Sequence, residues 1–220
     1  MTGVGVRRLA EEQAALRRVA TLVAGGTPPA EVFAAVTEEV ARLFPTDMTV
    51  MHRYDPDGMI TILGSVDSVG SLGKHWSVGS RWPLGGKNVG MLVFETARPA
   101  RIDNAEASGA HIDQAREAGV RSTVGVPILV VGRVWGLIGL VTTREEPLPA
   151  DTEARLAGFT ELVATAIANA ESRAGLARLA GSRLRCAASR HWSRAGRRRR
   201  RCSRPSPRRS GGCFASSARS

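Results

Sequence analysis

Side chains suited to lining a ligand pocket fall in two segments, residues 64–90 and 104–122. Trp76 and Trp82 lie in the first segment, which is rich in glycine and offers a large ring little helix or strand of its own to pack against. Small-molecule pockets combine apolar walls with a few polar groups. Tryptophans that simply cover a sheet are the alternative, because aromatic residues are mostly packing. We expect a pocket that combines the two tryptophans with three polar residues: Asn88, Arg121 and Ser122.

Three histidines could in principle ligate a metal or haem: His52, His75 and His111. Their separations of 23 and 36 residues match no compact ligand pattern. His52 also falls in a segment that alternates as a strand, which favours a packed or surface histidine. We therefore expect no metal site.

Cysteine chemistry is confined to the end of the chain, because its three cysteines are Cys186, Cys202 and Cys213. The preceding residues hold none. This distribution excludes a disulfide scaffold, a thiolate metal site and a cysteine nucleophile from the first 180 residues.

Nucleotide and kinase chemistry find no support in the motifs. The Gly73-Lys74 and Gly86-Lys87 pairs lack the other positions of a phosphate-binding loop. A phospho-acceptor histidine is normally followed by an acidic residue, and none of the four histidines is. The residues that follow them are Arg53, Trp76, Ile112 and Trp192.

The elements that must position these side chains are organised around a predicted β-hairpin, residues 121–144. β-branched residues alternate along its first half, a glycine turn follows at Val131-Gly132-Arg133, and a second apolar run returns. Pro127 requires an edge position or a bulge. Glycines in the returning strand indicate close backbone approach, at Gly136 and Gly139.

The rest of the chain alternates between helical and strand patterns. Apolar stripes predict helices at 7–24, 28–44 (capped by Thr27), 89–97 (opening after Asn88), 110–118 and 151–174. Alternation predicts strands at 48–54, 59–67 and 100–103, with a loop over 68–88. Strands that pair as hairpins, with helices grouped on one face, indicate an α+β domain with an antiparallel sheet.

The net charge of +11 belongs to one end of the chain. Residues 181–220 hold 13 arginines and no acidic residue, which leaves 18 basic and 20 acidic residues in 1–180. Such a tail predicts non-specific, salt-sensitive binding to nucleic acid at most. No run of about 18–20 apolar residues predicts a membrane helix, and the N-terminus lacks the apolar core of a signal peptide. We expect a cytoplasmic protein with no membrane contact.

Five motifs in order resemble the GAF domain, and more narrowly the GAF domains of actinobacterial sensor histidine kinases. They are RYDPDG, RWPLGG, ARPARIDN, GVRSTVGVPILVVGRVWGLIGL and LPADTEARLAGFTELVATAIANA, and the resemblance covers residues 8–174. It implies an antiparallel sheet of five to six strands, with a layer of terminal helices on one face. On the other face it implies a loop-and-helix lid over a small-molecule cavity. It also implies a homodimer formed through helices 7–24 and 151–174.

The resemblance implies a non-enzymatic sensory module for an unidentified small molecule, with no cofactor specified. The Asn-Lys-Phe-Asp-Glu signature of cyclic-nucleotide-binding relatives is absent. Neither a cysteine-attached bilin nor the cysteine-dependent reduction of free methionine sulfoxide fits a body without cysteine. A ligand-free structural dimerisation domain remains the alternative.

The chain divides into residues 1–7, expected to be disordered, the GAF-like residues 8–174, and a basic tail, 175–220, also expected to be disordered. Arg178-Leu179-Ala180 repeats Arg8-Leu9-Ala10. GC-rich codons for residues 12–16, read one base later, give Ser-Arg-Leu-Arg-Cys, the sequence of 182–186. The register holds at constant offset through residue 213. The tail is therefore expected to be a frame-shifted start of a second GAF domain, in a product truncated from a tandem-GAF sensor histidine kinase.

Overall fold

The computed structural model describes residues 3–74, 76–103, 105–110 and 112–198. The chain consists of two compact units, Met1–Arg173 and Ala174–Ser220. The elements run α1 (Gly3–Gly25), α2 (Pro29–Leu43), β1 (Met48–Tyr54), β2 (Met59–Asp67), β3 (Arg81–Pro83), α3 (Val89–Thr96), β4 (Ala100–Asp103), α4 (Ile112–Glu117), β5 (Ser122–Val130), β6 (Arg133–Thr142) and α5 (Thr152–Arg198).

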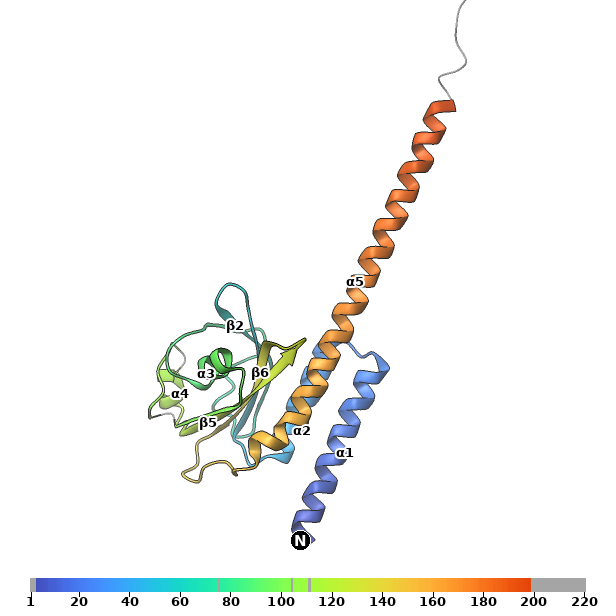
Figure 1. Ribbon diagram of the computed structural model, residues 1–220. Helices are drawn as coiled ribbons and strands as arrows, with labels where there is room; N and C mark the ends of the chain where they lie inside the picture. The colour runs from blue at the N-terminus through green and yellow to red at the C-terminus, as the bar shows by residue number, and fades with distance from the viewer. Residues whose placement is uncertain (1–2, 75, 104, 111, 199–220) are drawn as a thin grey trace, which may run out of the picture. The chain divides into compact units, whose positions relative to one another are not determined.

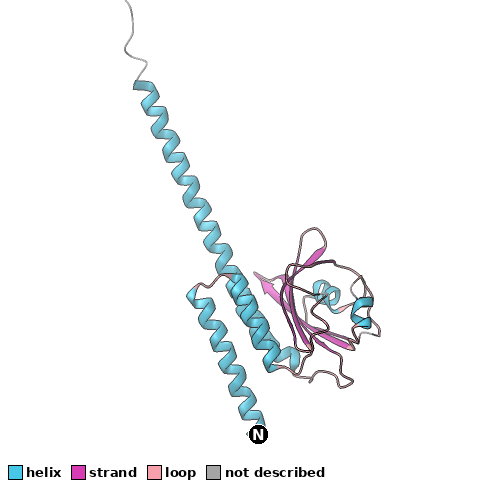
Figure 2. Ribbon diagram, turned by 180° about the vertical axis from the view of Figure 1, so that it is seen from behind, coloured by secondary structure: helices cyan, strands magenta, loops and turns pink. Residues whose placement is uncertain are grey.

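A six-stranded antiparallel sheet, in the order β3-β2-β1-β6-β5-β4, forms the centre of the first unit. The β5–β6 hairpin and the β1–β2 hairpin meet where β1 pairs with β6. Figure 1 shows α1, α2 and the start of α5 on one side of the sheet and α3 and α4 on the other. Figure 2 shows the same strands from behind, in magenta. This is the α+β architecture that the sequence predicts.

Period-two alternation explains why each strand serves two cores. The side of the sheet that carries α3, α4 and the loops around them is called the lid side. In β6, Ile138 and Leu140 face the terminal helices, whereas Leu137 and Val141 face the lid. The helix-side core is continuous and joins residues of α1, α2 and α5 to the sheet, including Val19, Val36, Leu156, Phe159 and Val163. On the lid side the apolar residues form two smaller clusters.

Glycines let β1 and β6 approach closely at the centre of the sheet. A Cβ atom added to Gly136 would lie 2.2 Å from the carbonyl oxygen of His52. Pro127 lies beyond the stretch of β5 that pairs with β4, and a register shift follows it between Ile128 and Leu129. Both features agree with the predicted hairpin.

Several element boundaries differ from the predicted ones. Residues 3–7, expected to precede the first helix, lie within α1. Pro28, not Thr27, occupies the cap position of α2, because a residue before proline avoids the helical region and Pro28 is extended (φ −53°, ψ 140°). The predicted loop 68–88 contains β3, whose three residues pair with β2.

The final helix extends beyond its predicted end near residue 174, because α5 continues to Arg198. Residues 175–198 are rich in alanine, leucine and arginine, which favour helix, and lack proline. Residues 175–198 thus belong to α5, whereas 199–220 lie outside the described part, and the disorder expected of the tail stays a prediction. Within the described residues, no helix is long and apolar enough to cross a membrane.

Candidate functional site

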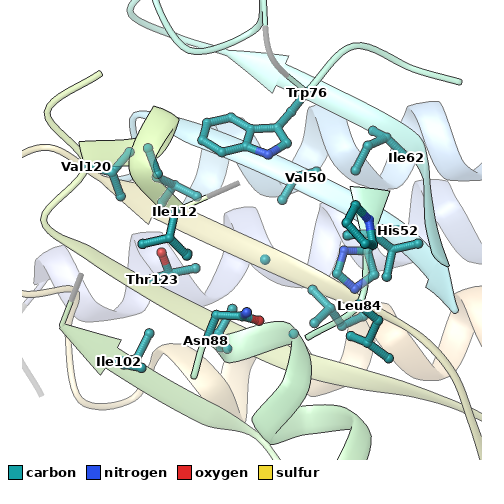
Figure 3. Close-up of a pocket in the computed structure, with 18 residues that line it drawn as sticks. Val50, His52, Ile62, Trp76, Leu84, Asn88, Ile102, Ile112, Val120 and Thr123 are labelled. Carbon is teal, nitrogen blue, oxygen red and sulfur yellow. The ribbon is translucent and has the colours of Figure 1, made fainter. Parts of the chain in front are cut away.

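A cavity of about 70 Å³ lies between the sheet and the lid, and separates the two lid-side apolar clusters. Ile62, Trp76, Ala115 and Val120 come from one cluster. Val89, Ile102, Ile112 and Leu137 come from the other. Figure 3 shows Trp76 and Asn88 on opposite sides of this space. Small residues of the sheet and α3 leave room for it, at Gly90 and Gly139.

The polar side chains of the cavity are few. Besides the Trp76 indole, the described residues that line it include only three with polar side chains, His52, Asn88 and Thr123, and no Asp, Glu, Lys or Arg. The His52 ring meets the Tyr54 ring edge-on, with centroids 5.1 Å apart. Burial raises the pKa of the Tyr54 hydroxyl, which donates a 2.6 Å hydrogen bond to the Gly90 carbonyl. The wall of the cavity is therefore mainly apolar.

Asn88 connects the lid to the start of α3. Its Oδ1 accepts from the Met91 N–H at 3.0 Å, which caps α3 as predicted. Its Nδ2 donates to the carbonyls of Gly85 at 2.7 Å and Ser108 at 3.2 Å. Both amide hydrogens are thus used by the protein, and Asn88 holds the lid together while forming part of the wall.

Residues 85–88 and 106–109 together form a clasp between two lid segments. The Ser108 N–H donates to the Lys87 carbonyl at 2.7 Å, and the Lys87 N–H donates to the Ser108 hydroxyl at 2.9 Å. Gly86, at φ +81°, approaches Ser108 so closely that an added Cβ would lie 2.3 Å from its carbonyl oxygen. Only glycine fits this contact without a shift of the backbone.

Asp67 orders the loop that carries Trp76. Its carboxylate accepts four backbone N–H bonds of 2.7–3.0 Å, from Val69, Gly70, Leu72 and Gly73. Burial raises the pKa of Asp67, but the four donors outweigh it and leave that pKa below its usual range. The loop therefore depends on an ionised Asp67.

A family model for the GAF domain matches residues 28–170, more than half of the chain. The chain belongs to the GAF domain family. The described fold agrees with it, and the resemblance seen in the sequence is confirmed at this level.

Solved structures of GAF domains share the fold. The phycoerythrobilin-bound GAF domain of a cyanobacterial phytochrome has a TM-score of 0.63 and 18% identity, and the match covers 74% of this chain and 98% of that one. A phycocyanobilin-bound GAF domain from a cyanobacterial phytochrome has a TM-score of 0.63 and 19% identity, and the match covers 74% of this chain and 96% of that one. No curated protein sequence matches the chain.

Two of the five predicted pocket residues, Trp76 and Asn88, line the cavity of this GAF domain. Trp82 lies on β3 opposite Ile60 and packs against the cluster that contains Trp76, so it covers the sheet. Arg121 and Ser122 line a separate open depression together with Arg116 and Arg144. The Arg121 guanidinium pairs there with Glu145 at 3.4 Å.

Sequence reasoning missed His52 and Thr123. The alternation that places Met48 and Val50 on the lid side also places His52 there. A strand position by itself favours a packed histidine, but the same period identifies the face that His52 shares with Met48 and Val50. His75 and His111 lie outside the described residues. Among those described, no group of acidic, cysteine or histidine side chains could hold a metal ion.

Proposed function

We propose that this GAF domain is a non-enzymatic sensory module, which binds a small molecule between sheet and lid and passes the binding event to its terminal helices. The observation that carries the proposal is the cavity between sheet and lid, with apolar walls and few polar groups. Pockets of that composition are the usual place for small ligands. Family membership supports a regulatory and not a catalytic role.

Strand β6 supplies the route from the cavity to the helices. Leu137, Gly139 and Val141 line the cavity, while Ile138 and Leu140 between them pack in the helix-side core with Phe159 of α5. A ligand that shifts β6 therefore shifts residues of the core that α5 shares. Such a ligand can bias the helices only by its differential affinity for two arrangements.

A bilin is not the ligand we propose. The two similar GAF domains have bilins bound, but similarity at 18–19% identity extends to fold alone. Attachment through cysteine requires a thiol, and every cysteine of this chain lies at or beyond residue 186. An open-chain tetrapyrrole is also much larger than a cavity of about 70 Å³.

We also propose that the chain derives from a longer signalling protein. We propose that the protein is cytoplasmic, homodimeric and active in signalling. One base lost near codon 181 truncated it from a tandem-GAF sensor histidine kinase. Its arginine-rich end binds nucleic acid only non-specifically. Reading the genomic DNA tests this origin: restoring one base should open a frame resembling residues 11–174. A downstream sequence unlike a GAF domain in every frame would refute it.

The sensory function is tested with the full chain by mass spectrometry of small molecules that co-purify with it. Ala115→Leu fills the cavity from α4, and Ala154→Leu adds the same atoms at an exposed position on α5. We expect a compound that is lost in the first variant and kept in the second. Absence of any such compound, with no metabolite raising the Tm, would favour the structural dimerisation domain instead.

A further inference from the structure

We propose that the cavity selects a small uncharged ligand, a mainly apolar body that carries one hydrogen-bonding group directed at Thr123. This inference rests on the proposed function and names its ligand class. Three features support it: the absence of Asp, Glu, Lys and Arg among the described lining residues, the hydrogen bonding of Asn88 and Thr123, and the size of the space.

Charge is excluded by the energetics of burial. An ion without a partner in an apolar site costs far more free energy than a neutral group, and proteins avoid the combination. Charged side chains of the surrounding lid are engaged elsewhere. Lys87 pairs with Glu106 at 3.0 Å on the surface, and Arg116 pairs with Asp113 at 3.2 Å. Burial also raises the pKa of the neighbouring Tyr54, so the environment disfavours charge.

Thr123 is the polar group best placed to meet a ligand. Asn88 spends both amide hydrogens on Gly85 and Ser108. The Thr123 hydroxyl, by contrast, makes no hydrogen bond to any of the described residues and lies at the cavity wall, as Figure 3 shows. A hydroxyl both donates and accepts, so it can pair with an alcohol, a phenol or a carbonyl oxygen.

The space limits the ligand to a few atoms. A cavity needs about 10–15 Å³ of such volume to hold one water molecule. This cavity has about 70 Å³. The closed cavity therefore accepts a body comparable to roughly five waters. A single six-membered ring is near that limit, and Trp76, Ile62 and Leu84 offer it apolar contacts.

The test uses three probes on the full chain: toluene, phenol and benzoate. Toluene and phenol have the same size and differ by a methyl and a hydroxyl, while benzoate adds a charge. We expect phenol to raise the Tm most, toluene less, and benzoate not at all, since ligands that bind only the folded state stabilise it. Titration calorimetry gives the affinities.

Variants locate the binding. Thr123→Val keeps the shape and removes the hydroxyl, so phenol should lose about two- to tenfold in affinity while toluene is unchanged. Ala115→Leu should abolish the binding of both, and Ala154→Leu should not. Ala115→Val provides a smaller filling variant if Ala115→Leu fails to fold.

Two outcomes overturn the inference. Binding of benzoate as tight as that of phenol, sensitive to Ala115→Leu, contradicts the exclusion of charge but leaves the sensory function standing. Failure of both neutral probes to bind contradicts the ligand class. The proposed function falls as well only if no compound co-purifies in a manner that depends on the cavity.

Discussion

The Nε atom of Arg155 lies 2.7 Å from Oε2 of Glu12, and each side chain is only 11% exposed. This pair joins α5 to α1, and the Arg155 guanidinium also lies 4.4 Å from the centre of the Phe44 ring. A buried ion pair adds little to stability compared with an apolar pair, but removal of one partner leaves the other charge buried alone.

Replacement of Glu12 by glutamine should therefore lower the free energy of unfolding by about 3–5 kcal/mol. Urea denaturation measures the change. Glu11→Gln is the matched control, since the Glu11 side chain is 55% exposed and its ion-pair partner Arg7 is 84% exposed. Exposed ion pairs contribute about 0–1 kcal/mol. Equal effects of the two variants would contradict the distinction.

Asp67→Asn should destabilise the Trp76 loop by about 1.5–3 kcal/mol, the range for hydrogen bonds to a charged group. The lowered pKa of Asp67 means that its contribution is complete above pH of about 4 and is lost as the pH falls through the folded-state value. The stability curves of wild type and variant should thus converge below that pH. A constant difference from pH 7 to pH 2 would rule this out, and Asp113→Asn on exposed α4 serves as the control.

Gly86→Ala should open the clasp, because the new methyl meets the Ser108 carbonyl at 2.3 Å. Gly79→Ala shares the unfavourable backbone, at φ +89°, but meets nothing within 4 Å. Hydrogen exchange at residues 106–109 should accelerate in the first variant only. Similar protection in both would show that Gly86 is needed for its φ angle and not for the contact.

Val131→Asn should stabilise the protein by about 1 kcal/mol or more, because a β-branched residue in the left-handed region is strained. Val131 (φ 50°) and Gly132 (φ 74°) form a two-residue turn of the kind that favours Asn-Gly. Val131 is 89% exposed, so no packing is lost. Val78→Asn, an exposed valine without positive φ, should change the Tm little. A lower Tm for Val131→Asn would contradict the account.

Leu9→Glu should give a monomer in light scattering if the proposed dimer forms through α1. Leu9 is 50% exposed, and Val6 near it on α1 is similarly exposed. Val19 is unsuitable for this test because it is fully buried in the helix-side core, so a glutamate there would unfold the domain. Glu38→Gln on α2 provides a surface control. A wild-type protein that is monomeric at high concentration would refute the dimer.

Local patterns predicted the strands of the first hairpin well. Alternation gives β1 and β2 with the bounds that the structure has, because Asp55-Pro56-Asp57-Gly58 punctuates them. β3 has three residues, too few for a period, and is fixed by its pairing with β2 and by Arg81, which bonds Asp55 and Asp57 of the turn. Such tertiary contacts leave no local signal.

The candidate site was predicted only in part for the same reason. Asn88 was identifiable as a helix cap, and a cap that opens a lid helix also faces the cavity. Arg121 precedes β5 and Ser122 is its first paired residue, and both line the outer depression. Thr123, one residue on, lines the cavity. A shift of one position reverses the face of a strand, and residue type alone does not reveal that parity.

The alternation of β6 makes the domain separable for engineering. Leu137 and Val141 can be exchanged for other apolar residues to admit new analytes, while 138 and 140 keep the helix-side core unchanged. Gly139 stays glycine, because an added Cβ would lie 3.1 Å from Cγ1 of Val50. A library of apolar residues at 137 and 141 would therefore vary recognition while the face that packs on the helices stays as it is, which is the property a biosensor chassis requires.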